Sequence, residues 1–407
     1  MRPTIRLTTL LVLFAALTGC QNGPAKIGVV LPLTGEHAAY GEASQKGIDL
    51  AWEVLQEKGS PSIEILATVD SASDPQAAAA ALEGAYDGGA LAVIGGLTAP
   101  ETALMTPVAE QYERVLLSPS LTDNVLLAGS RQVYSLAPSD RAAGSTLGGF
   151  AARDLKVRTA ALLAAEGYAA ADLEAGFRAA LENLGGEVLA VTEVPAGGAA
   201  TLVSETMALK PDALVLAGEN GKLGEILREV RSQGYKGKIL TTRALTAPGN
   251  VETLGKAAVG VLVAQTVLSA PASAGEATTD GPMAEFAERY QAKYGEAPDV
   301  LAAEAYDAVM VMAAAMNGRH PLASEVREGL RDEIKNFPGV TGEIQFNDKG
   351  GVGKYPRVYS VSADLSLRDH SKLLEEERER IRLKKKELED RLRNLGSGSI
   401  PSAGGSP

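Results

Sequence analysis

Cysteine and histidine are almost absent from this chain of 407 residues. It contains one cysteine and three histidines, so an intramolecular disulfide is excluded and the usual ligands of a structural zinc site are too few. We therefore expect neither a metal nor another cofactor. The chain is also longer than the size at which a single hydrophobic core keeps growing, which predicts two domains or lobes.

Aromatic and basic residues are scarce as well. Aromatic residues make up only 4% of the chain, so the core must be built mainly from smaller aliphatic side chains. Lysine and arginine (39 residues) are outnumbered by aspartate and glutamate (51 residues), which gives a formal net charge of -12. A nucleic-acid partner requires a basic surface for its phosphates, so this balance argues against one and fits a soluble protein that binds small solutes.

The first twenty residues have the pattern of an export signal. Two arginines precede a short apolar run at residues 10–17, which is too short to span a bilayer. The segment Leu17-Thr18-Gly19-Cys20 that follows resembles the lipobox of bacterial lipoproteins, in which the cysteine is acylated and becomes the mature N-terminus. We expect a signal peptide over residues 1–19 and a lipidated tether over residues 20–25, which would hold the protein on a bacterial membrane. An ordinary signal peptide with a coincidental cysteine is the alternative.

Strand-like and helix-like patterns alternate through the body of the chain. Short apolar runs predict strands at residues 26–31, 63–69, 91–95, 115–118, 159–164, 187–194, 213–217 and 238–241. Between them, helical periodicity predicts helices at 42–58, from 74, from 99, and at 169–184, 201–209 and 222–233. Asp74 and Pro75 have the N-cap and first-turn pattern of a helix start. This alternation predicts an α/β fold with parallel sheets that are covered by helices on both faces.

The chain beyond residue 365 has a different composition. Residues 368–393 are dense in Glu, Lys and Arg, and residues 396–407 have the low complexity of a disordered linker. We predict a charged helical tail over residues 365–395. Its one apolar position per heptad is half of a coiled-coil seam, so a solvated helix and a weak oligomerisation or partner helix both stay open. For a solvated tail, deleting residues 366–407 is expected to leave the melting temperature and the ligand response nearly unchanged.

Several short motifs occur in order along the body. They are Ile27-Gly-Val-Val-Leu-Pro-Leu-Thr-Gly35, Ala39-Tyr-Gly41, Gly47-Ile-Asp-Leu-Ala51, Gly95-Gly-Leu-Thr98, Ser118-Pro119, Glu304-Ala-Tyr-Asp307 and Thr341-Gly-Glu-Ile-Gln-Phe346. In this order and spacing they resemble the leucine/isoleucine/valine-binding protein family, which are type I solute-binding proteins of bacterial ABC importers. The resemblance covers residues 26–361 and leaves out the tail.

The resemblance implies the two-lobed type I periplasmic-binding-protein fold. Each lobe would be a parallel sheet flanked by helices, and three crossing segments would join the lobes. By analogy, lobe 1 is expected at residues 25–139 and 268–338, and lobe 2 at residues 140–267 and 339–364. Ligand would bind between the lobes at the carboxyl ends of the strands, and hinge closure would bury it.

One group of candidate residues would bind a ligand carboxylate. Residues 95–99 join a predicted strand to a helix, so free backbone N–H groups at Thr98 and Ala99 would point outward. The family usually has serine where Ala99 stands, which leaves the backbone donors and Thr98. Ser120 and Thr122 align with family contacts to the same carboxylate. A plain capped turn, and turn residues that bond to their own backbone, are the alternatives.

A second group would surround the rest of the ligand. Tyr40 and Tyr168 resemble the aromatic walls that close on the ligand from the two lobes. Asp140 aligns with the acid that binds the ligand ammonium, although it would also suit a helix cap. Glu219 stands where the family commonly has tyrosine, and Arg243 stands where a second acid is usual. A buried guanidinium needs a counter-charge, so we expect a ligand other than leucine, isoleucine or valine, unless Glu219 pairs with Arg243 internally.

These expectations combine into one function. The chain would be a membrane-anchored, periplasmic or cell-surface lipoprotein that captures a small amino acid or organic acid for an ABC permease. The alternative is an envelope sensory or assembly lipoprotein that uses the same fold for protein interaction without transport. An enzyme has little support, because we find no nucleophile elbow, no histidine paired with a nucleophile and no metal-ligand cluster.

Overall fold

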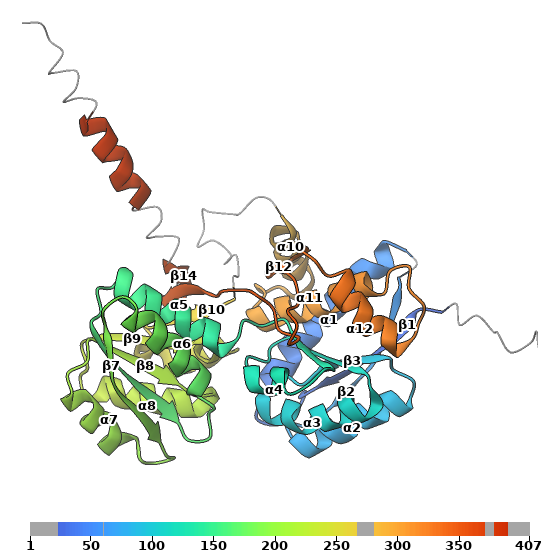
Figure 1. The fold of residues 1–407 in the computed structure, drawn as a ribbon, viewed down its shortest axis with the longest axis horizontal. Coiled ribbons are helices and arrows are strands. Elements are labelled where there is room, and N and C mark those ends of the chain that lie inside the picture. The colour runs from blue at the N-terminus through green and yellow to red at the C-terminus, as the bar shows by residue number, and fades with distance from the viewer. Residues whose placement is uncertain (1–22, 60, 267–280, 371–377, 390–407) are drawn as a thin grey trace, which may run out of the picture. The chain divides into compact units, whose positions relative to one another are not determined.

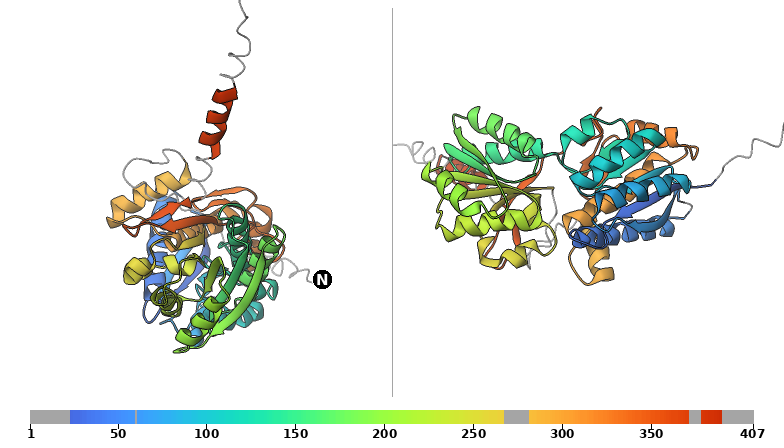
Figure 2. Two further views of the ribbon diagram at one scale, coloured as in Figure 1. Left: turned by 90° about the vertical axis from the view of Figure 1, so that its left-hand side faces the viewer. Right: turned by 90° about the horizontal axis from the view of Figure 1, so that it is seen from below.

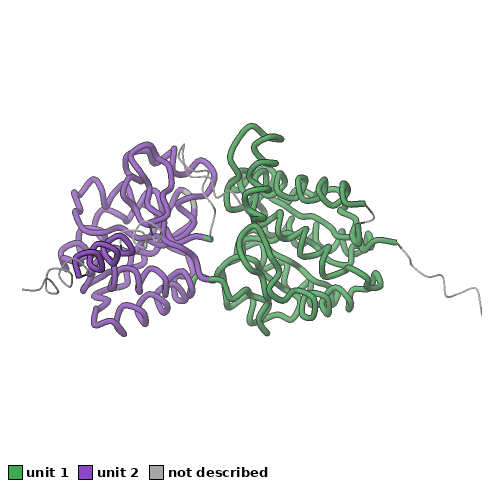
Figure 3. Tube along the Cα trace, turned by 90° about the horizontal axis from the view of Figure 1, so that it is seen from above, with its two compact units in different colours: residues 1–140, 266–354 green, residues 141–265, 355–407 purple. Residues whose placement is uncertain are grey.

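The computed structural model describes residues 23–59, 61–266, 281–370 and 378–389. The chain divides into two compact units (Figures 1 and 3): unit 1 is Met1–Asp140 with Thr266–Lys354, and unit 2 is Arg141–Gln265 with Tyr355–Pro407. The chain thus passes between the units three times. Cys20 and the expected signal peptide lie outside the described residues, as do residues 371–377 and 390–407 of the predicted tail.

The third crossing, from unit 1 to unit 2, follows residue 354, whereas it was expected after residue 338. Residues 339–354 belong to unit 1 rather than to the second lobe. The physical reason is that this segment is hydrogen-bonded into unit 1 at two places. The Asp307 side chain accepts from the Val340 N–H at 2.8 Å, and the Gly350 carbonyl accepts from the Ser135 N–H at 2.8 Å.

Unit 1 is built on a five-stranded parallel sheet with the order β2-β1-β3-β4-β5. Its strands are β1 (Ala25–Leu31), β2 (Ile63–Asp70), β3 (Ala92–Gly95), β4 (Val115–Ser118) and β5 (Val133–Ser135). The helices of this unit are α1 (Ala38–Glu57), α2 (Pro75–Asp87), α3 (Ala99–Tyr112), α4 (Asn124–Ala128), α10 (Pro282–Tyr294), α11 (Val300–Ala315) and α12 (Ala323–Asp332). A short antiparallel hairpin pairs β11 (Phe337–Gly339) with β12 (Gly342–Ile344).

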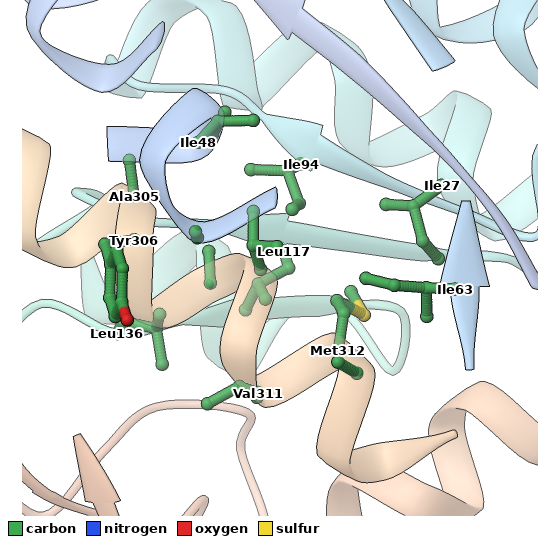
Figure 4. Packing of buried hydrophobic residues seen from close by; sticks show 14 of the residues in the cluster. Ile27, Ile48, Ile63, Ile94, Leu117, Leu136, Ala305, Tyr306, Val311 and Met312 are labelled. Atoms are coloured by element: carbon green, nitrogen blue, oxygen red, sulfur yellow. The ribbon is translucent and has the colours of Figure 1, made fainter. Parts of the chain in front are cut away.

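Successive residues of the unit 1 strands point into two different cores. On β3, Ile94 packs in the cluster formed with α1 and α11, whereas Val93 packs in the cluster formed with α2 and α3. Figure 4 shows the first of these clusters, with Ile48 of α1 and Met312 of α11 beside the strands. Because both faces of the sheet are buried, its strands are nearly continuous apolar runs, as the sequence predicted.

Helices α1 and α11 approach each other closely at a glycine. A Cβ atom on Gly47 would lie 2.1 Å from the carbonyl oxygen of Ala302, so no larger residue fits there without moving the backbone. This contact holds α11, which comes late in the chain, against α1 and the sheet. The tight packing fixes the position of α11 in unit 1.

Unit 2 is built on a seven-stranded sheet with the order β14-β13-β10-β9-β8-β6-β7. Its strands are β6 (Thr159–Ala165), β7 (Glu187–Val194), β8 (Ala213–Ala217), β9 (Lys238–Thr242), β10 (Leu262–Gln265), β13 (Arg357–Val361) and β14 (Leu367–Asp369). Its helices are α5 (Asp140–Arg153), α6 (Ala171–Glu182), α7 (Ala199–Ala208), α8 (Asn220–Ser232) and α9 (Asn250–Leu254), with the 3-10 turns η1 (Arg243–Thr246) and η2 (Gly255–Ala257). Helices cover both faces of each sheet (Figures 1 and 2).

The sheet of unit 2 is not purely parallel, which corrects the expectation. Strand β13 runs antiparallel to β10, and β14 runs antiparallel to β13. A tight turn joins β13 and β14, in which the Ser362 N–H donates to the Ser366 carbonyl at 2.8 Å. A connection this short can only join antiparallel neighbours, because a parallel pair needs a crossover of a dozen residues or more.

The charged tail begins later than the sequence predicted. Residues 367–369 form β14, and Asp369 forms a 2.9 Å ion pair with Arg357 on β13. The ring of His370 packs edge-on against Phe150 of α5, with 5.4 Å between the ring centroids. Residues 378–389 are helical and exposed along their whole length, and Arg378 forms an ion pair with Asp154 of unit 2. The true appendage therefore starts after residue 370.

Two deletions separate the appendage from the sheet edge. Removing residues 371–407 is expected to leave the melting temperature and the ligand response nearly unchanged, because the described helix buries no side chain. Removing residues 366–407 also deletes β14 and should lower stability by about 1–3 kcal/mol. Differential scanning calorimetry and light scattering on the two truncations test this. Loss of folding, or of a defined oligomer, in the shorter deletion would show that the tail supports the body.

Candidate functional site

The candidate residues of unit 1 follow four neighbouring strands at the same end of the sheet. Tyr40 comes after β1, Thr98 and Ala99 come after β3, Thr122 comes after β4, and Asp140 comes after β5. Because these strands are parallel neighbours, their carboxyl ends form one edge, where open α/β sheets bind ligands. The topology therefore places these five residues at one edge of unit 1.

The Thr98 hydroxyl caps the start of α3 and is bonded twice to Glu101. This hydroxyl accepts from the Glu101 N–H at 3.4 Å and donates to Glu101 Oε2 at 3.3 Å. The Ser71 hydroxyl donates to the other carboxylate oxygen of Glu101 at 2.6 Å, and the Glu101 side chain is almost wholly buried. The Thr98 hydroxyl was expected to donate to a ligand. It can do so only by giving up its bond to the Glu101 carboxylate. The Thr-x-x-Glu spacing at residues 98–101 is the sequence signal that would have found Glu101.

Backbone donors remain open at the start of α3. Within the described residues, the N–H groups of Thr98 and Ala99 make no hydrogen bond, and Pro100 has none to offer. Gly96 has φ +65°, and a Cβ there would lie 2.8 Å from the Thr102 hydroxyl, so this turn requires glycine. Two free N–H groups at a helix N-terminus attract a carboxylate through hydrogen bonding and the helix dipole.

The loop after β4 is hydrogen-bonded to the loop after β3. The Ser120 hydroxyl donates to the Leu97 carbonyl at 2.8 Å, so Ser120 must give up this bond before it can donate to a ligand. The Thr122 hydroxyl, by contrast, makes no hydrogen bond in the described part of the chain, and its side chain is half-buried. The Thr122 carbonyl accepts from the Asp140 N–H at 3.0 Å, which fixes the start of α5 beside this loop.

Tyr40 lies in the first turn of α1, which begins earlier than the helix predicted from residue 42. Its ring meets that of His37 edge-on at 5.7 Å between centroids. The loop before it is held by Asp70, whose carboxylate accepts from the Leu33 N–H at 2.8 Å and from the Thr34 hydroxyl at 2.7 Å. The Thr34 hydroxyl is also the main reason that the pKa of Asp70 is lowered. Asp70 thus keeps its charge and holds the loop that leads to Tyr40.

The candidates of unit 2 repeat this arrangement. Tyr168 follows β6, Glu219 follows β8 and Arg243 follows β9, and these three strands are parallel neighbours in the order β9-β8-β6. All three side chains are half-buried. Glu219 occupies the N-cap position of α8 but makes no side-chain capping bond, and Arg243 is the first residue of η1. The topology therefore brings Tyr168, Glu219 and Arg243 to one edge of unit 2.

The turn that carries Arg243 is held from two directions. The Thr246 hydroxyl bonds to the Arg243 carbonyl at 2.9 Å and to the Gln265 side chain at 2.5 Å. The Asn250 amide donates to the Ala244 carbonyl at 2.9 Å. This support fixes the backbone from which the guanidinium extends.

The described residues hold no group of three or more His, Cys, Asp or Glu side chains that could bind a metal ion. In the same part of the chain, none of the helices has the length and apolar character that crossing a bilayer requires.

Comparison with known proteins identifies the family. A profile described as periplasmic binding protein matches residues 24–363. Leu/Ile/Val-binding protein homolog 3 from Brucella melitensis is 24% identical over 243 residues, which are 58% of this chain and 66% of that protein, just under two thirds of its length. The leucine-binding protein LivK from Thermotoga maritima is 28% identical, with a TM-score of 0.73 over 84% of this chain and 97% of its own.

A solute-binding protein from R. palustris, solved in complex with benzoate, shares the fold. Its identity is 18% and its TM-score is 0.71, and the match covers 86% of this chain and 96% of that protein. The profile, the order of the motifs and the two α/β units agree with one another. The chain therefore belongs to the periplasmic binding protein family, within the group that includes the Leu/Ile/Val-binding proteins.

Proposed function

We propose that this protein is a solute-binding protein that captures a small amino-acid-like or carboxylate ligand and delivers it to an ABC permease. The observation that carries this is the β3–α3 turn, where the open N–H groups of Thr98 and Ala99 lie at a helix N-terminus. The Thr122 hydroxyl, on the loop bonded to that turn, is available as a third donor. Relatives of this chain are named for binding leucine, isoleucine and valine, and one neighbour in fold binds benzoate.

Each remaining candidate has a chemical role in this proposal. The Asp140 carboxylate would bind a ligand ammonium, because a charge-assisted hydrogen bond is stronger than a neutral one. Tyr40 of unit 1 and Tyr168 of unit 2 would contact the apolar part of the ligand through their ring faces. Ser120 would join the carboxylate donors only if its bond to Leu97 is exchanged for one to the ligand. Arg243 and Glu219 would select the ligand side chain.

Membership of this family implies a periplasmic protein. The finer proposal is that it is tethered there through an acylated Cys20, as the Leu17-Thr18-Gly19-Cys20 segment indicates. The cell surface is the alternative site for the same anchor. The tether from Cys20 to β1 would span five residues and reach at most about 18 Å, so the body would stay close to the bilayer.

A second candidate function rests on the charged helix at residues 378–389. This helix is exposed along its described length and lies outside the family match, so ligand delivery does not require it. The protein would then act as an envelope sensory or assembly lipoprotein, and the helix would contact a protein partner or another copy of the chain. Such a protein would not need to bind a small solute.

A thermal-shift screen against amino acids, organic acids and short peptides distinguishes the two functions. A ligand at 100 times its dissociation constant should raise the free energy of unfolding by about 2.7 kcal/mol. With that ligand, Thr122→Val should lose about 10- to 100-fold in affinity, since a hydrogen bond to a charged group contributes about 1.5–3 kcal/mol.

Thr106→Val is the matched control, because the Thr106 hydroxyl bonds within α3 to the Thr102 carbonyl at 2.7 Å. It should bind the ligand as tightly as the wild type. A complete absence of stabilisation across the panel would favour the interaction function, and an equal loss in both variants would remove Thr122 from the site.

A further inference from the structure

Helix α11 carries two buried carboxylates that the proposed ligand site does not use. Glu304 and Asp307 lie among the buried apolar residues of this helix and are 0% and 1% exposed. They are three positions apart, so they share one face of the helix. Buried charges are costly unless they are paired and hydrogen-bonded, so their partners should explain why they are there.

Asp307 holds the segment that leads to the third crossing. Its Oδ1 accepts from the Val340 N–H at 2.8 Å, and its Oδ2 accepts from the Thr341 N–H at 2.9 Å and from the Thr341 hydroxyl. The same hydroxyl accepts from Lys354 Nζ at 2.6 Å. Lys354 is the last residue of unit 1 before the chain enters unit 2. The network thus joins the helix to the residue at which the chain leaves the unit.

Glu304 holds the second crossing in the same way. Its Oε1 accepts from the Thr266 hydroxyl at 2.8 Å, and Thr266 is only 2% exposed. Thr266 is the first residue of unit 1 after the chain returns from unit 2. Two carboxylates on one helix face therefore hold the second and third crossings, Glu304 directly at Thr266 and Asp307 through Thr341 at Lys354.

The neighbouring hairpin leaves room for the Asp307 carboxylate only because it has a glycine there. A Cβ on Gly339 would lie 2.7 Å from Asp307 Oδ2, so the β11–β12 hairpin can approach only with glycine at this position. Burial raises the pKa of Asp307, whereas Lys354 and the hydrogen bonds at Thr341 and Val340 favour its charged form. Burial lowers the pKa of Lys354, and Asp307 and Glu304 oppose that change. Asp307 and Lys354 therefore each favour the charged form of the other.

We propose that Glu304 and Asp307 are positioning residues that anchor the second and third crossings to α11, so that the inter-unit hinge begins immediately outside Thr266 and Lys354. A hinge works best when few residues absorb the backbone rotation and the flanking chain is rigid. Without these anchors, the bending would spread into unit 1. The anchoring itself holds with or without ligand; its use in ligand capture rests on the proposed function.

The test measures the spread of inter-unit distances in the ligand-free, full-length chain. Spin labels are attached at Lys58→Cys, on the exposed end of α1, and Glu205→Cys, on the exposed face of α7, in a Cys20→Ser background. Double electron–electron resonance then reports the distance distribution. Asp307→Asn and Lys354→Met should each at least double its width, and Thr266→Val should widen it to a smaller extent.

Two comparisons separate anchoring from stability. Leu82→Ala opens a cavity in the α2–α3 core, away from the crossings, and should lower the melting temperature without widening the distribution. The double variant Asp307→Asn with Lys354→Met removes both members of the Asp307–Lys354 pair, so neither is left buried without the other, and it should recover melting temperature relative to the single variants. It should nevertheless keep the wide distribution, because the anchor is still missing.

Three results would overturn the proposal. They are an unchanged width in both Asp307→Asn and Lys354→Met, a return to the wild-type width in the double variant, and an equal widening in Leu82→Ala. In each case the network would only stabilise unit 1. Because no ligand is present, none of these results bears on whether the protein binds a solute, which the thermal-shift screen decides separately.

Discussion

Replacing Arg243 with alanine is expected to weaken binding of the native ligand by about 30- to 3000-fold. The guanidinium extends from a turn held by Thr246 at the carboxyl edge of the unit 2 sheet. Truncating one partner of a buried hydrogen-bonded charge pair costs about 2–5 kcal/mol, and each 1.4 kcal/mol is a factor of ten in affinity. The ligand that this arginine selects would carry a second anionic or strongly polar group.

Isothermal titration calorimetry with a dicarboxylate, an acidic amino acid, an aromatic acid and valine tests this prediction. Arg243→Lys keeps the charge but loses the planar fork, so it should recover only part of the affinity. Arg228→Ala removes the same charge from an exposed position on α8 and should bind as the wild type does. Micromolar binding of valine or leucine, undiminished in Arg243→Ala, would contradict the predicted specificity.

The effect of Glu219→Gln on binding distinguishes two partners for Arg243, the ligand and Glu219 itself. If the ligand supplies the counter-charge of Arg243, Glu219→Gln should leave binding intact or strengthen it, because a nearby negative charge no longer competes. If Glu219 itself pairs with Arg243, Glu219→Gln should weaken binding, since the freed guanidinium is left without its internal partner. The two residues follow neighbouring strands β8 and β9, so both outcomes fit the topology.

Changing Cys20 to serine is expected to release the protein completely from the membrane fraction. Several acyl chains, each contributing about 0.8 kcal/mol per buried CH₂ group, make anchoring effectively permanent, and the variant has no site for them. Fractionation of expressing bacteria, with intact-mass measurement of the purified protein, tests this. In the control Cys20→Ser with Lys58→Cys, the new cysteine lies outside the lipobox and should not restore anchoring. Wild-type protein that is wholly soluble and unmodified would rule out the lipid anchor.

Local patterns predicted several strands accurately, both in the buried centre of a sheet and at its half-exposed edge. The apolar runs at residues 115–118, 187–194 and 213–217 match β4, β7 and β8 residue for residue. The helix start at Asp74 is as predicted, with its side chain accepting from the Gln76 and Ala77 N–H groups. These features depend on residues within a few positions of one another, so a single sequence is enough to determine them.

The candidate site was predictable in its position but only partly in its hydrogen bonds. The strand ends that carry Thr98, Thr122 and Arg243 follow from the alternation and the family resemblance. The Thr98 cap on α3 could have been inferred from the Thr-x-x-Glu spacing, but the bond from the Ser120 hydroxyl to the Leu97 carbonyl could not, because it joins two different loops. Ser71, which completes the Glu101 network, is thirty positions away in the chain.

The sequence by itself determined the α/β class, most strand and helix positions, and the strand ends at which a ligand would bind. Only the tertiary structure decided the antiparallel edge at β13 and β14, the start of the tail after residue 370, and the anchoring of Lys354 through Thr341 to Asp307. The physical reason is the separation in sequence between the residues that interact. Periodicity and capping act within one or two turns, whereas sheet edges and buried charge networks join segments that are distant in the chain and become neighbours only after the cores have packed.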